Sequence, residues 1–277
     1  MRVGFIGLGS QGAPMARRIS ESGHTLTLWA RSESTLEPFA DVAFSRASTP
    51  AEVGTTSEVV GVCVRGDADV EDVVLGSNGV LKGMVAGSVL VIHSTVHPDT
   101  CRRLGSLAVE HGVDVLDAPV SGGGQAARDR RLLVLVGGDT EVLERVTPVL
   151  SAFGDPIRHV GPLGAGQTAK LVNNALFAAN LSLANDALAL GVALGLDESE
   201  LLECLKHGSA NSGALGLAAG MRPRLSDPSS GPANVASLLT KDLNLVGELA
   251  AREGAEVAPL REVADRWLSL VTPLSET

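Results

Sequence analysis

Hydrophobic residues in the first half of the chain gather in short, nearly continuous runs. These runs, each bounded by polar or glycine-rich residues, cover 1–7, 25–30, 58–64, 87–94, 113–119 and 132–138. Segments in which apolar residues recur with the helical period lie between several of them, such as 13–22 and 98–111. Because buried strands that alternate with helices usually form parallel sheets, the pattern predicts a parallel sheet covered by helices on both faces.

The pattern changes after the glycine-rich segment 161–166, beyond which only helical spacing is found. The predicted helices cover 167–196, 197–208, 235–252 and 259–271, with a short helical piece and a Gly/Pro/Ser-rich break at 226–232 before the third. We therefore predict two domains of ordinary size, an α/β domain over residues 1–162 and an all-helical domain over residues 163–277.

Composition and charge exclude several classes of function. Aromatic residues make up only 3% of the chain, so the core must be built from Ala, Leu and Val. A net charge of −10 argues against binding to nucleic acid or to an anionic membrane surface. The cysteines Cys63, Cys101 and Cys204 lack metal-ligand spacing, which predicts reduced thiols in a cytoplasmic protein and no metal site.

Neither a signal peptide nor a membrane span is expected. No charged segment followed by a short apolar stretch opens the sequence. The apolar run 171–196 is long enough to cross a bilayer, but it holds four asparagines and an aspartate, which are costly in lipid.

A glycine-rich turn follows the first predicted strand and opens the first predicted helix. In GFIGLGSQGAPMARRI, Gly7, Gly9 and Gly12 form G-x-G-x-x-G. The first glycine permits the tight turn, the second lets the backbone approach a pyrophosphate, and the third lets helix and strand pack closely. The context predicts a Rossmann-type, doubly wound sheet that binds a dinucleotide through Gly7, Leu8, Gly9, Ser10, Gln11 and Gly12.

The end of the second predicted strand indicates which dinucleotide is bound. NAD-binding proteins usually carry an acidic residue there, whereas this chain has Arg31 and Ser32, and Glu33 follows too late. A guanidinium can pair with a 2′-phosphate and stack on adenine, and a hydroxyl can donate a hydrogen bond to the phosphate. The prediction is a preference for NADP(H), with Arg31 as an ordinary surface charge and NAD(H) as the alternative.

Four segments together resemble the β-hydroxyacid dehydrogenases, the 3-hydroxyisobutyrate dehydrogenase-like branch of the 6-phosphogluconate dehydrogenase superfamily. They are GFIGLGSQGAPMA (4–16), DAPVSGG (117–123), GAGQTAKLVNN (164–174) and LLTKDLNL (238–245). The resemblance implies an NAD(P)-dependent enzyme that interconverts a small β-hydroxy acid and its semialdehyde or keto acid.

The same resemblance implies a role for individual residues. Lys170 matches the catalytic lysine, and Asn174, with Asn173 beside it, matches a residue that helps to hold the substrate. The carboxylate cradle is implied at Ser121, Gly122 and Gly123. Further cofactor contacts are implied at Val64, Arg65, Thr95 and Lys241.

The chemistry of the lysine agrees with the implied role. Oxidation of an alcohol requires removal of its proton, and a lysine amine can accept that proton whereas an arginine cannot usefully do so. The chain has 18 arginines and only 4 lysines, so a lysine within an apolar helix is a better candidate here than in a lysine-rich chain. Lys170 and Asn174 stand four residues apart and share a helix face. Consecutive N–H groups at 121–123 can form a nest for a carboxylate.

Each feature also has a structural alternative. Lys170 could extend from a helix end towards solvent, residues 121–124 could be a flexible hinge, and Lys241 with Asp242 could be a solvated pair. Other functions left open are an imine reductase of similar fold and a non-catalytic NADPH-binding protein. The apolar positions of the helix from Gln167 wrap around more than one face, which predicts contacts of a homodimer or homotetramer.

Departures from the family pattern leave the substrate open beyond a small carboxylate-bearing molecule. The family usually has Met at the position of Gln11, Gly at Arg130 and Phe at Asn234. The segment LVTPLSET (270–277) also lacks the Gly/Asp/Ser-rich tail that the family usually carries.

Overall fold

The computed structural model describes residues 1–225 and 231–271. Its chain forms two compact units, Met1–Lys170 and Leu171–Thr277. Helix α7 (Ala165–Ala193) runs through this division, so that its first turns belong to the first unit. The domain boundary predicted after residue 162 lies just before this helix and stays a prediction.

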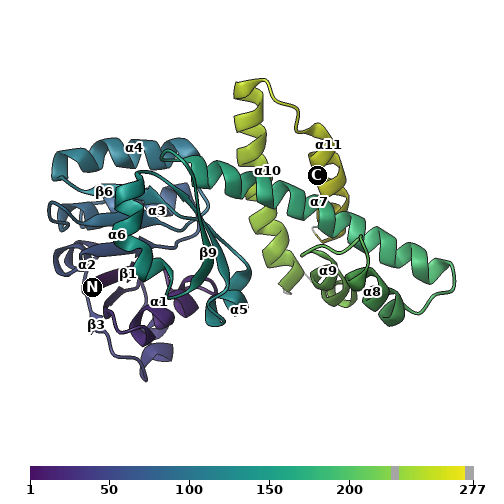
Figure 1. The fold of residues 1–277 in the computed structure, drawn as a ribbon, viewed down its shortest axis with the longest axis horizontal. Coiled ribbons are helices and arrows are strands. Elements are labelled where there is room, and N and C mark those ends of the chain that lie inside the picture. The colour runs from purple at the N-terminus through teal and green to yellow at the C-terminus, as the bar shows by residue number, and fades with distance from the viewer. Residues whose placement is uncertain (226–230, 272–277) are drawn as a thin grey trace. The chain divides into compact units, whose positions relative to one another are not determined.

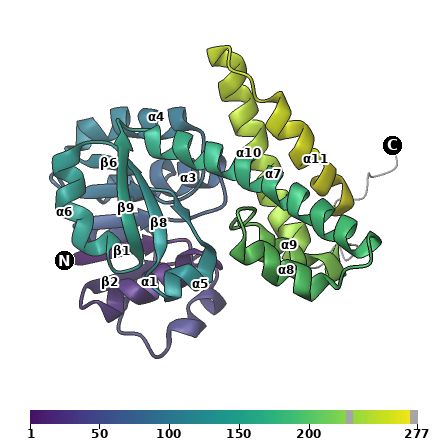
Figure 2. The ribbon, with the colours of Figure 1, turned by 45° about the vertical axis from the view of Figure 1, so that its right-hand side comes forward.

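The first unit is built on a single sheet with helices on both faces (Figures 1 and 2). The strand order is β3-β2-β1-β4-β5-β6-β8-β7, and β9 pairs with β8. The strands are β1 (Arg2–Ile6), β2 (Thr25–Trp29), β3 (Ser45–Arg46), β4 (Val59–Val62), β5 (Val89–Ile92), β6 (Asp114–Asp117), β7 (Val120–Ser121), β8 (Leu132–Gly137) and β9 (Gly154–Gly161). The helices are α1 (Gly12–Glu21), α2 (Pro50–Thr56), α3 (Asp67–Leu75), α4 (Pro98–Ala108), α5 (Gly123–Arg128) and α6 (Thr140–Leu150).

The predicted parallel, doubly wound sheet is confirmed from β3 to β6, where every pair of neighbouring strands is parallel. Strand β8 departs from it, because it runs antiparallel to β6 and to β7. A parallel return needs a crossover of a dozen or more residues, usually a full helix. The connection 118–131 is long enough, but it forms β7, which pairs antiparallel with β8, and the 6-residue helix α5, which is too short to carry the chain back along the sheet. Strand β8 therefore runs in the opposite direction to β6.

Successive side chains of the strands fill the two layers beside the sheet. Phe5 packs in one hydrophobic cluster, together with residues of α1 and α6. Ile6 packs in the other cluster, on the opposite face, with residues of α3 and α4. This alternation is why the strand sequences are apolar almost throughout, as expected for a sheet buried on both faces.

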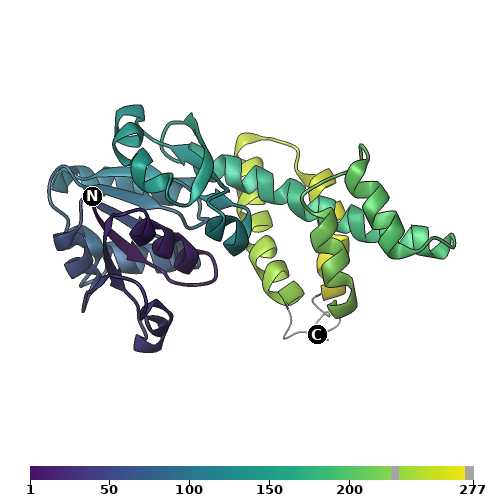
Figure 3. The same cartoon turned by 60° about the horizontal axis from the view of Figure 1, so that its bottom comes forward.

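The second unit is all-helical over its described residues, as predicted (Figure 3). It contains the rest of α7 and α8 (Glu198–His207), α9 (Leu215–Met221), α10 (Gly231–Glu253) and α11 (Ala258–Val271). Trp267 is 1% exposed and lies in the hydrophobic core of this unit. The predicted break at 226–232 falls mostly on 226–230, and these residues and the end of the predicted tail segment, 272–277, lie outside the described residues.

Among the described residues, α7 is the helix that is long and apolar enough to cross a membrane. Half of its most apolar window is buried inside the protein, as in the core helix of a domain. Its exposed side carries an apolar stripe at intervals of four and seven residues, made up of Val172, Leu176, Leu183 and Leu190. The predicted homodimer or homotetramer contacts of this helix stay a prediction.

A neutral histidine is buried in the core of the first unit. The His93 ring stacks on Phe5, with ring centroids 5.9 Å apart, and meets the edge of Phe153 at 5.5 Å. Its Nδ1 lies 2.8 Å from the carbonyl oxygen of Ala118, to which it donates a hydrogen bond when that nitrogen carries the proton. Burial lowers the pKa of His93 to about 4, although the bond to Ala118 opposes this shift.

This depressed pKa predicts an acid-sensitive first unit. Below the ordinary histidine pKa of about 6.5, the unfolded chain takes up a proton that the folded chain does not bind. The free energy of unfolding therefore falls as the pH drops from about 6.5 towards 4, by about 3 kcal/mol from this residue. In denaturant unfolding between pH 7 and 4, the free energy of unfolding should fall less steeply for His93→Asn, which keeps a donor for Ala118, than for the wild type. The control His111→Asn changes an exposed histidine and should show the same fall as the wild type. Equal declines for the wild type and His93→Asn would contradict the assignment.

Arg130 adopts a left-handed backbone conformation at the turn between α5 and β8. Its φ is +58°, a value that L-residues other than Asn and Asp rarely adopt. This is the position at which the family resemblance implies glycine. The side chain is exposed, so the backbone strain is not relieved by burial of the guanidinium.

Replacing Arg130 by glycine should stabilise the protein slightly. The left-handed conformation costs about 1–2 kcal/mol for an L-residue, and glycine gives back about 0.5–1 kcal/mol through its freer unfolded chain. We expect Arg130→Gly to raise the unfolding midpoint by about 1–3 °C in a thermal scan. Arg130→Ala removes the same guanidinium but keeps the strain and should bring no increase. An equal increase in both variants would show that the charge, and not the backbone, is responsible.

Candidate functional site

The glycine turn between β1 and α1 has the geometry that its sequence predicts. Gly7 has a φ of +97°, and a Cβ there would lie 2.1 Å from the carbonyl oxygen of Cys63. A Cβ on Gly12 would lie 1.9 Å from the carbonyl oxygen of Gly7, which explains the close contact of helix and strand. A Cβ on Gly9 would meet nothing within 4 Å, so open space faces the backbone at the second glycine.

The start of α1 is suited to a negatively charged group. The first turn of the helix carries no acidic residue, and the Gln11 side chain makes no capping hydrogen bond to it. Gln11 instead places its amide 3.7 Å from the sulfur of Met15. Ser10 is exposed, whereas Leu8 is buried in the core, so Leu8 can reach a ligand only through its backbone. Because helix N-termini attract phosphate, the turn fits the pyrophosphate of a dinucleotide.

Two acidic residues hold Arg31 beyond the end of β2. Its Nη2 donates to Asp69 Oδ1 at 2.9 Å and to Asp72 Oδ2 at 3.3 Å, both on α3. Ser32 lies beside it, with its Oγ 2.8 Å from the Oγ of Ser34. A 2′-phosphate at this position would therefore share Arg31 with two carboxylates that the sequence analysis did not identify. Their positions, 38 and 41 residues further along the chain, gave no local signal.

The loops that follow β4 and β5 are joined to each other. The backbone N–H of Val64 donates to Ser94 Oγ at 2.8 Å. Arg65 is exposed and Thr95 is half-buried. The loops carrying the predicted cofactor contacts Val64, Arg65 and Thr95 thus lie side by side at the carboxyl edge of the sheet, where open α/β sheets bind their ligands.

The predicted carboxylate cradle packs against the glycine turn. Gly122, between β7 and α5, and Gly123, the first residue of α5, have φ values of +129° and +74°. A Cβ on the next residue, Gly124, would lie only 2.6 Å from the carbonyl oxygen of Ser10. The structure therefore brings the Ser121–Gly123 segment next to the cofactor turn, although these residues are more than a hundred positions apart.

A buried carboxylate fixes the start of α7, which carries Lys170. Asp117, at the end of β6, is 0% exposed and accepts hydrogen bonds from the backbone N–H groups of Gly164 at 2.6 Å and Gln167 at 2.7 Å. Burial raises the pKa of Asp117, and these N–H bonds oppose that shift. Lys170 follows in the same helix and is 8% exposed. Among the lysines and arginines whose side chains the structure describes, it alone is buried.

The polar residues of the second unit form a chain of contacts. Asn173 Nδ2 donates to Asn174 Oδ1 at 3.0 Å, and Asn174 Nδ2 donates to Asp242 Oδ2 at 2.6 Å. Lys241 Nζ lies 2.7 Å from Asp242 Oδ1. Asp242 is 4% exposed whereas Lys241 is half-buried, so the carboxylate of this pair is not solvated. The resemblance implies a role for Asn173, Asn174 and Lys241 in this unit. The contacts join all three to the carboxylate of Asp242, for which no functional role was predicted.

Asp117 and Gln167 are two further residues of the site that were not predicted from the sequence. Asp117 had a signal, because an aspartate at the end of an apolar strand is exceptional unless it is paired. Gln167 had a weaker signal, a polar residue at the start of an apolar helix. Asn234, by contrast, is exposed on α10, and its predicted influence on the substrate stays a prediction.

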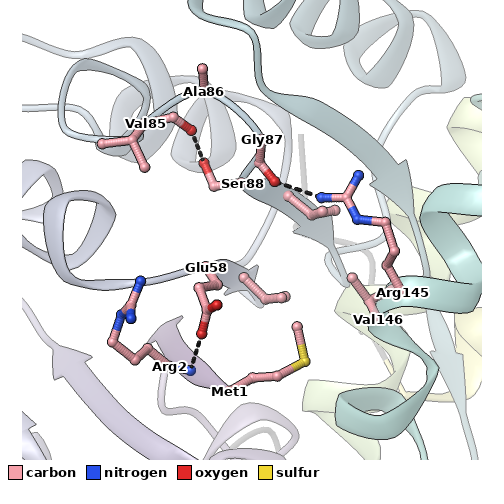
Figure 4. A pocket seen from close by; sticks show the side chains of 11 residues that line it. Met1, Arg2, Glu58, Val85, Ala86, Gly87, Ser88, Arg145 and Val146 are labelled. Atoms are coloured by element: carbon pink, nitrogen blue, oxygen red, sulfur yellow. Dashed lines mark hydrogen bonds between the residues drawn. The ribbon is translucent and has the colours of Figure 1, made fainter.

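One hollow of the first unit lies away from the candidate site (Figure 4). Its lining includes Arg2, Glu58, Gly87 and Arg145, at the amino ends of β1, β4 and β5 and on α6. The polar groups there are paired with one another, since Arg2 N donates to Glu58 Oε2 at 2.8 Å and Arg145 Nη2 donates to the Gly87 carbonyl at 2.5 Å. The residues predicted for the cofactor follow the carboxyl ends of the strands, at the opposite edge. Over the described residues, no three His, Cys, Asp or Glu side chains gather to hold a metal ion.

Comparisons with known proteins cover nearly the whole chain. Residues 2–161 match the family described as the NAD binding domain of 6-phosphogluconate dehydrogenase. Residues 164–274 match the family described as the NAD-binding of NADP-dependent 3-hydroxyisobutyrate dehydrogenase.

Individual relatives agree with the two families. The chain is 35% identical over 270 residues to the NAD-dependent L-serine dehydrogenase of Pseudomonas aeruginosa, a match that covers 95% of this chain and 89% of that protein. It is 35% identical over 249 residues to the 2-hydroxy-3-oxopropionate reductase of Escherichia coli, covering 88% of this chain and 82% of that protein. A solved structure of the Mycobacterium tuberculosis 3-hydroxyisobutyrate dehydrogenase with L-serine has a TM-score of 0.79 and 28% identity, covering 96% of this chain and 93% of that one.

The glycine turn, the buried lysine and the cradle beside the turn lie in a chain that these families match almost from end to end. The protein belongs to the NAD(P)-dependent β-hydroxyacid dehydrogenases of the 6-phosphogluconate dehydrogenase superfamily.

Proposed function

We propose that the protein is an NADP(H)-preferring dehydrogenase or semialdehyde reductase that acts on a small β-hydroxy acid, with Lys170 as the general acid and base. The observation that carries the proposal is the burial of Lys170 at the start of a helix that is hydrogen-bonded to the loop around Thr95, a predicted cofactor contact. Burying a cation is costly, and a chain with 18 arginines and 4 lysines has placed a lysine there.

The residues of the first unit divide the chemistry between them. Gly7 to Gly12 would hold the pyrophosphate of the dinucleotide at the start of α1. When bound, the nicotinamide cofactor supplies or accepts the hydride. The Lys170 amine takes the proton of the alcohol during oxidation and returns it during reduction, which an arginine could not do. The backbone N–H groups of residues 121–123 would hold the substrate carboxylate beside the cofactor turn.

The names of the relatives support the class of substrate. One relative is named for L-serine and another for 2-hydroxy-3-oxopropionate, and the related solved structure is named as holding L-serine. These are three-carbon carboxylates with an oxygen on the β carbon. We therefore propose a C3–C5 β-hydroxy acid or its semialdehyde as the substrate of this protein.

Replacement of Lys170 tests the proposed mechanism. Both Lys170→Met, which keeps the length of the side chain, and Lys170→Arg, which keeps the charge, should lower turnover of the best C3–C5 semialdehyde by about 10²–10⁴-fold. The Kd for NADPH should change by no more than a few-fold. The matched control is Lys82→Met, which replaces an exposed lysine whose Nζ donates to the Ser77 carbonyl, and it should keep full turnover. NADPH oxidation followed by absorbance, with fluorescence titration of the cofactor, measures both quantities.

The same assay separates the alternatives. Full turnover by Lys170→Met would refute the mechanism. Reduction of a panel of cyclic imines, without reduction of any aldehyde, would identify an imine reductase. Binding of NADPH without turnover of either panel would identify a non-catalytic binding protein.

Replacement of Arg31 tests the proposed cofactor preference. Because a charge-assisted bond to a phosphate contributes about 1.5–3 kcal/mol, Arg31→Ala should raise the Kd for NADPH by about 10–100-fold and leave the Kd for NADH within two-fold. The control Arg46→Ala removes a neighbouring arginine that is paired with Glu33 and should change neither constant. Fluorescence titration of NADPH and NADH against the wild type, Arg31→Ala and Arg46→Ala measures these constants. Comparable wild-type affinities for NADH and NADPH would refute the preference, and they would agree with the NAD-dependent relative from Pseudomonas aeruginosa.

A further inference from the structure

The side chain of Gln167 is fully buried and uses both ends of its amide. It is 0% exposed. Its Oε1 accepts a hydrogen bond from the backbone N–H of Val96 at 3.1 Å, and its Nε2 donates to the carbonyl of Ser94 at 2.9 Å. The two partners stand on either side of Thr95, so a single side chain holds the backbone before and after that residue.

The contacts of Gln167 extend to a second cofactor loop. Ser94, whose carbonyl Gln167 binds, accepts the N–H of Val64 on its Oγ at 2.8 Å. The glutamine thus ties the first turn of α7 to the loops after β5 and β4, both of which carry predicted cofactor contacts. We call the set Gln167, Ser94, Val96 and Val64 the amide clamp.

The backbone of Gln167 is itself held in place. Asp117 accepts its N–H at 2.7 Å. Two glycines leave room for this carboxylate, because a Cβ on Gly137 would lie 2.3 Å from Asp117 Oδ1 and one on Gly166 would lie 2.7 Å from Oδ2. The clamp is therefore built on a rigid support, and α7 cannot slide or rotate at this point without breaking buried hydrogen bonds.

Lys170 stands three residues after Gln167, on a neighbouring position of the same helix surface. We propose that Gln167 is a positioning residue, which fixes Lys170 relative to the Thr95 loop and so sets the distance between the acid/base amine and the bound cofactor. The proposal rests on the acid/base role proposed for Lys170. Gln167 acts through the helix and the loop and does not itself touch the reacting atoms.

The chemistry of the side chain explains why glutamine is required. A methionine would fill the same space but would leave the N–H of Val96 and the carbonyl of Ser94 without their partner. A glutamate could still accept from Val96, but when ionised it could not donate to Ser94. Only an amide at the end of two methylenes satisfies both groups at once. Small displacements of catalytic groups lower rates by as much as about 10²-fold, so the clamp should be visible in turnover more than in binding.

The test compares Gln167→Met and Gln167→Glu with the wild type and with Thr168→Val. The control residue Thr168 lies in the same turn and donates from Oγ1 to the Gly164 carbonyl at 3.1 Å, but it does not take part in the clamp. For the best semialdehyde we would measure kcat, KM, the Kd for NADPH, and the isotope effect on kcat with NADPH deuterated at the transferred position. Hydrogen exchange at the Val96 N–H reports on the clamp without any need for turnover.

We expect Gln167→Met to lower kcat by about 10–100-fold, while KM and the Kd for NADPH stay within three-fold. The isotope effect on kcat should increase, because hydride transfer becomes slower relative to the other steps. Exchange at Val96 should become faster by at least ten-fold. The kcat of Gln167→Glu should lie between those of Gln167→Met and the wild type. Thr168→Val should keep kcat within two-fold of the wild type.

Three results would overturn the proposal. The first is a kcat of Gln167→Met within two-fold of the wild type together with fast exchange at Val96. The second is an equal loss of kcat in Gln167→Met and Thr168→Val when the two variants also lose equal thermal stability. The role of Gln167 would then be purely structural. The third is slow exchange at Val96 in Gln167→Met, which would show that the hydrogen bond does not protect that N–H. A wild-type protein that turns over no semialdehyde would refute the proposed function, and with it the positioning role. That failure is recognised separately, because cofactor binding and exchange at Val96 do not depend on turnover.

Discussion

The hydrogen bonds between the Asp117 carboxylate and the start of α7 are the contacts on which the candidate site depends. A fully buried carboxylate is costly, and burial alone raises the pKa of Asp117. Two N–H groups at the N-terminus of a long helix offset that cost, because they point at the charge and the helix dipole favours it there. The end of β6 and the beginning of α7 are thereby held together, and the lysine of α7 receives a fixed place.

The rest of the first unit uses the carboxyl edge of its sheet in the same way. Some segments at this edge approach another backbone too closely for a side chain, and others hold a neighbouring loop by a hydrogen bond. Gly7 and Gly12 are examples of the first device, and the bond from Val64 to Ser94 is an example of the second. Such contacts leave little freedom, which suits a site where a hydride and a proton move between fixed positions.

The second unit offers a buried polar network of its own. The Asp242 carboxylate accepts the amide of Asn174 and pairs with Lys241, so its charge is compensated although it is hardly exposed. Removing either partner would leave part of this carboxylate unsatisfied, whereas the apolar residues around it need no such partner. The polar residues within these otherwise apolar helices therefore stabilise one another through specific contacts.

The sequence predicted the parts of the fold that follow from burial. The apolar runs gave the strands from β1 to β8 apart from β3 and β7, and the change of period gave the helical second unit. Strand β9 was missed because most of its residues are exposed or half-buried and it has no apolar run. The antiparallel β8 was missed because the direction of a strand depends on the structure that its connection forms, which the apolar runs do not report.

The site was predictable to the extent that short motifs carried it. The glycine turn, the segment 121–123 and Lys170 could be read from local sequence. The pairing of Arg31 with Asp69 and Asp72 could not, since it depends on how α3 packs beside β2. The clamp of Gln167 is also non-local, because its partners lie more than seventy residues earlier in the chain.

A crystal structure of the protein with NADP(H) and a non-reacting analogue of a C3–C5 β-hydroxy acid would test the central claim most directly. The account predicts Lys170 Nζ within about 3.2 Å of the analogue's β-oxygen, the reach of a proton-transferring group, and the carboxylate on the N–H groups of residues 121–123. It would be contradicted by a complex in which another titratable side chain lies at that distance from the β-oxygen and the Lys170 amine does not face the ligand.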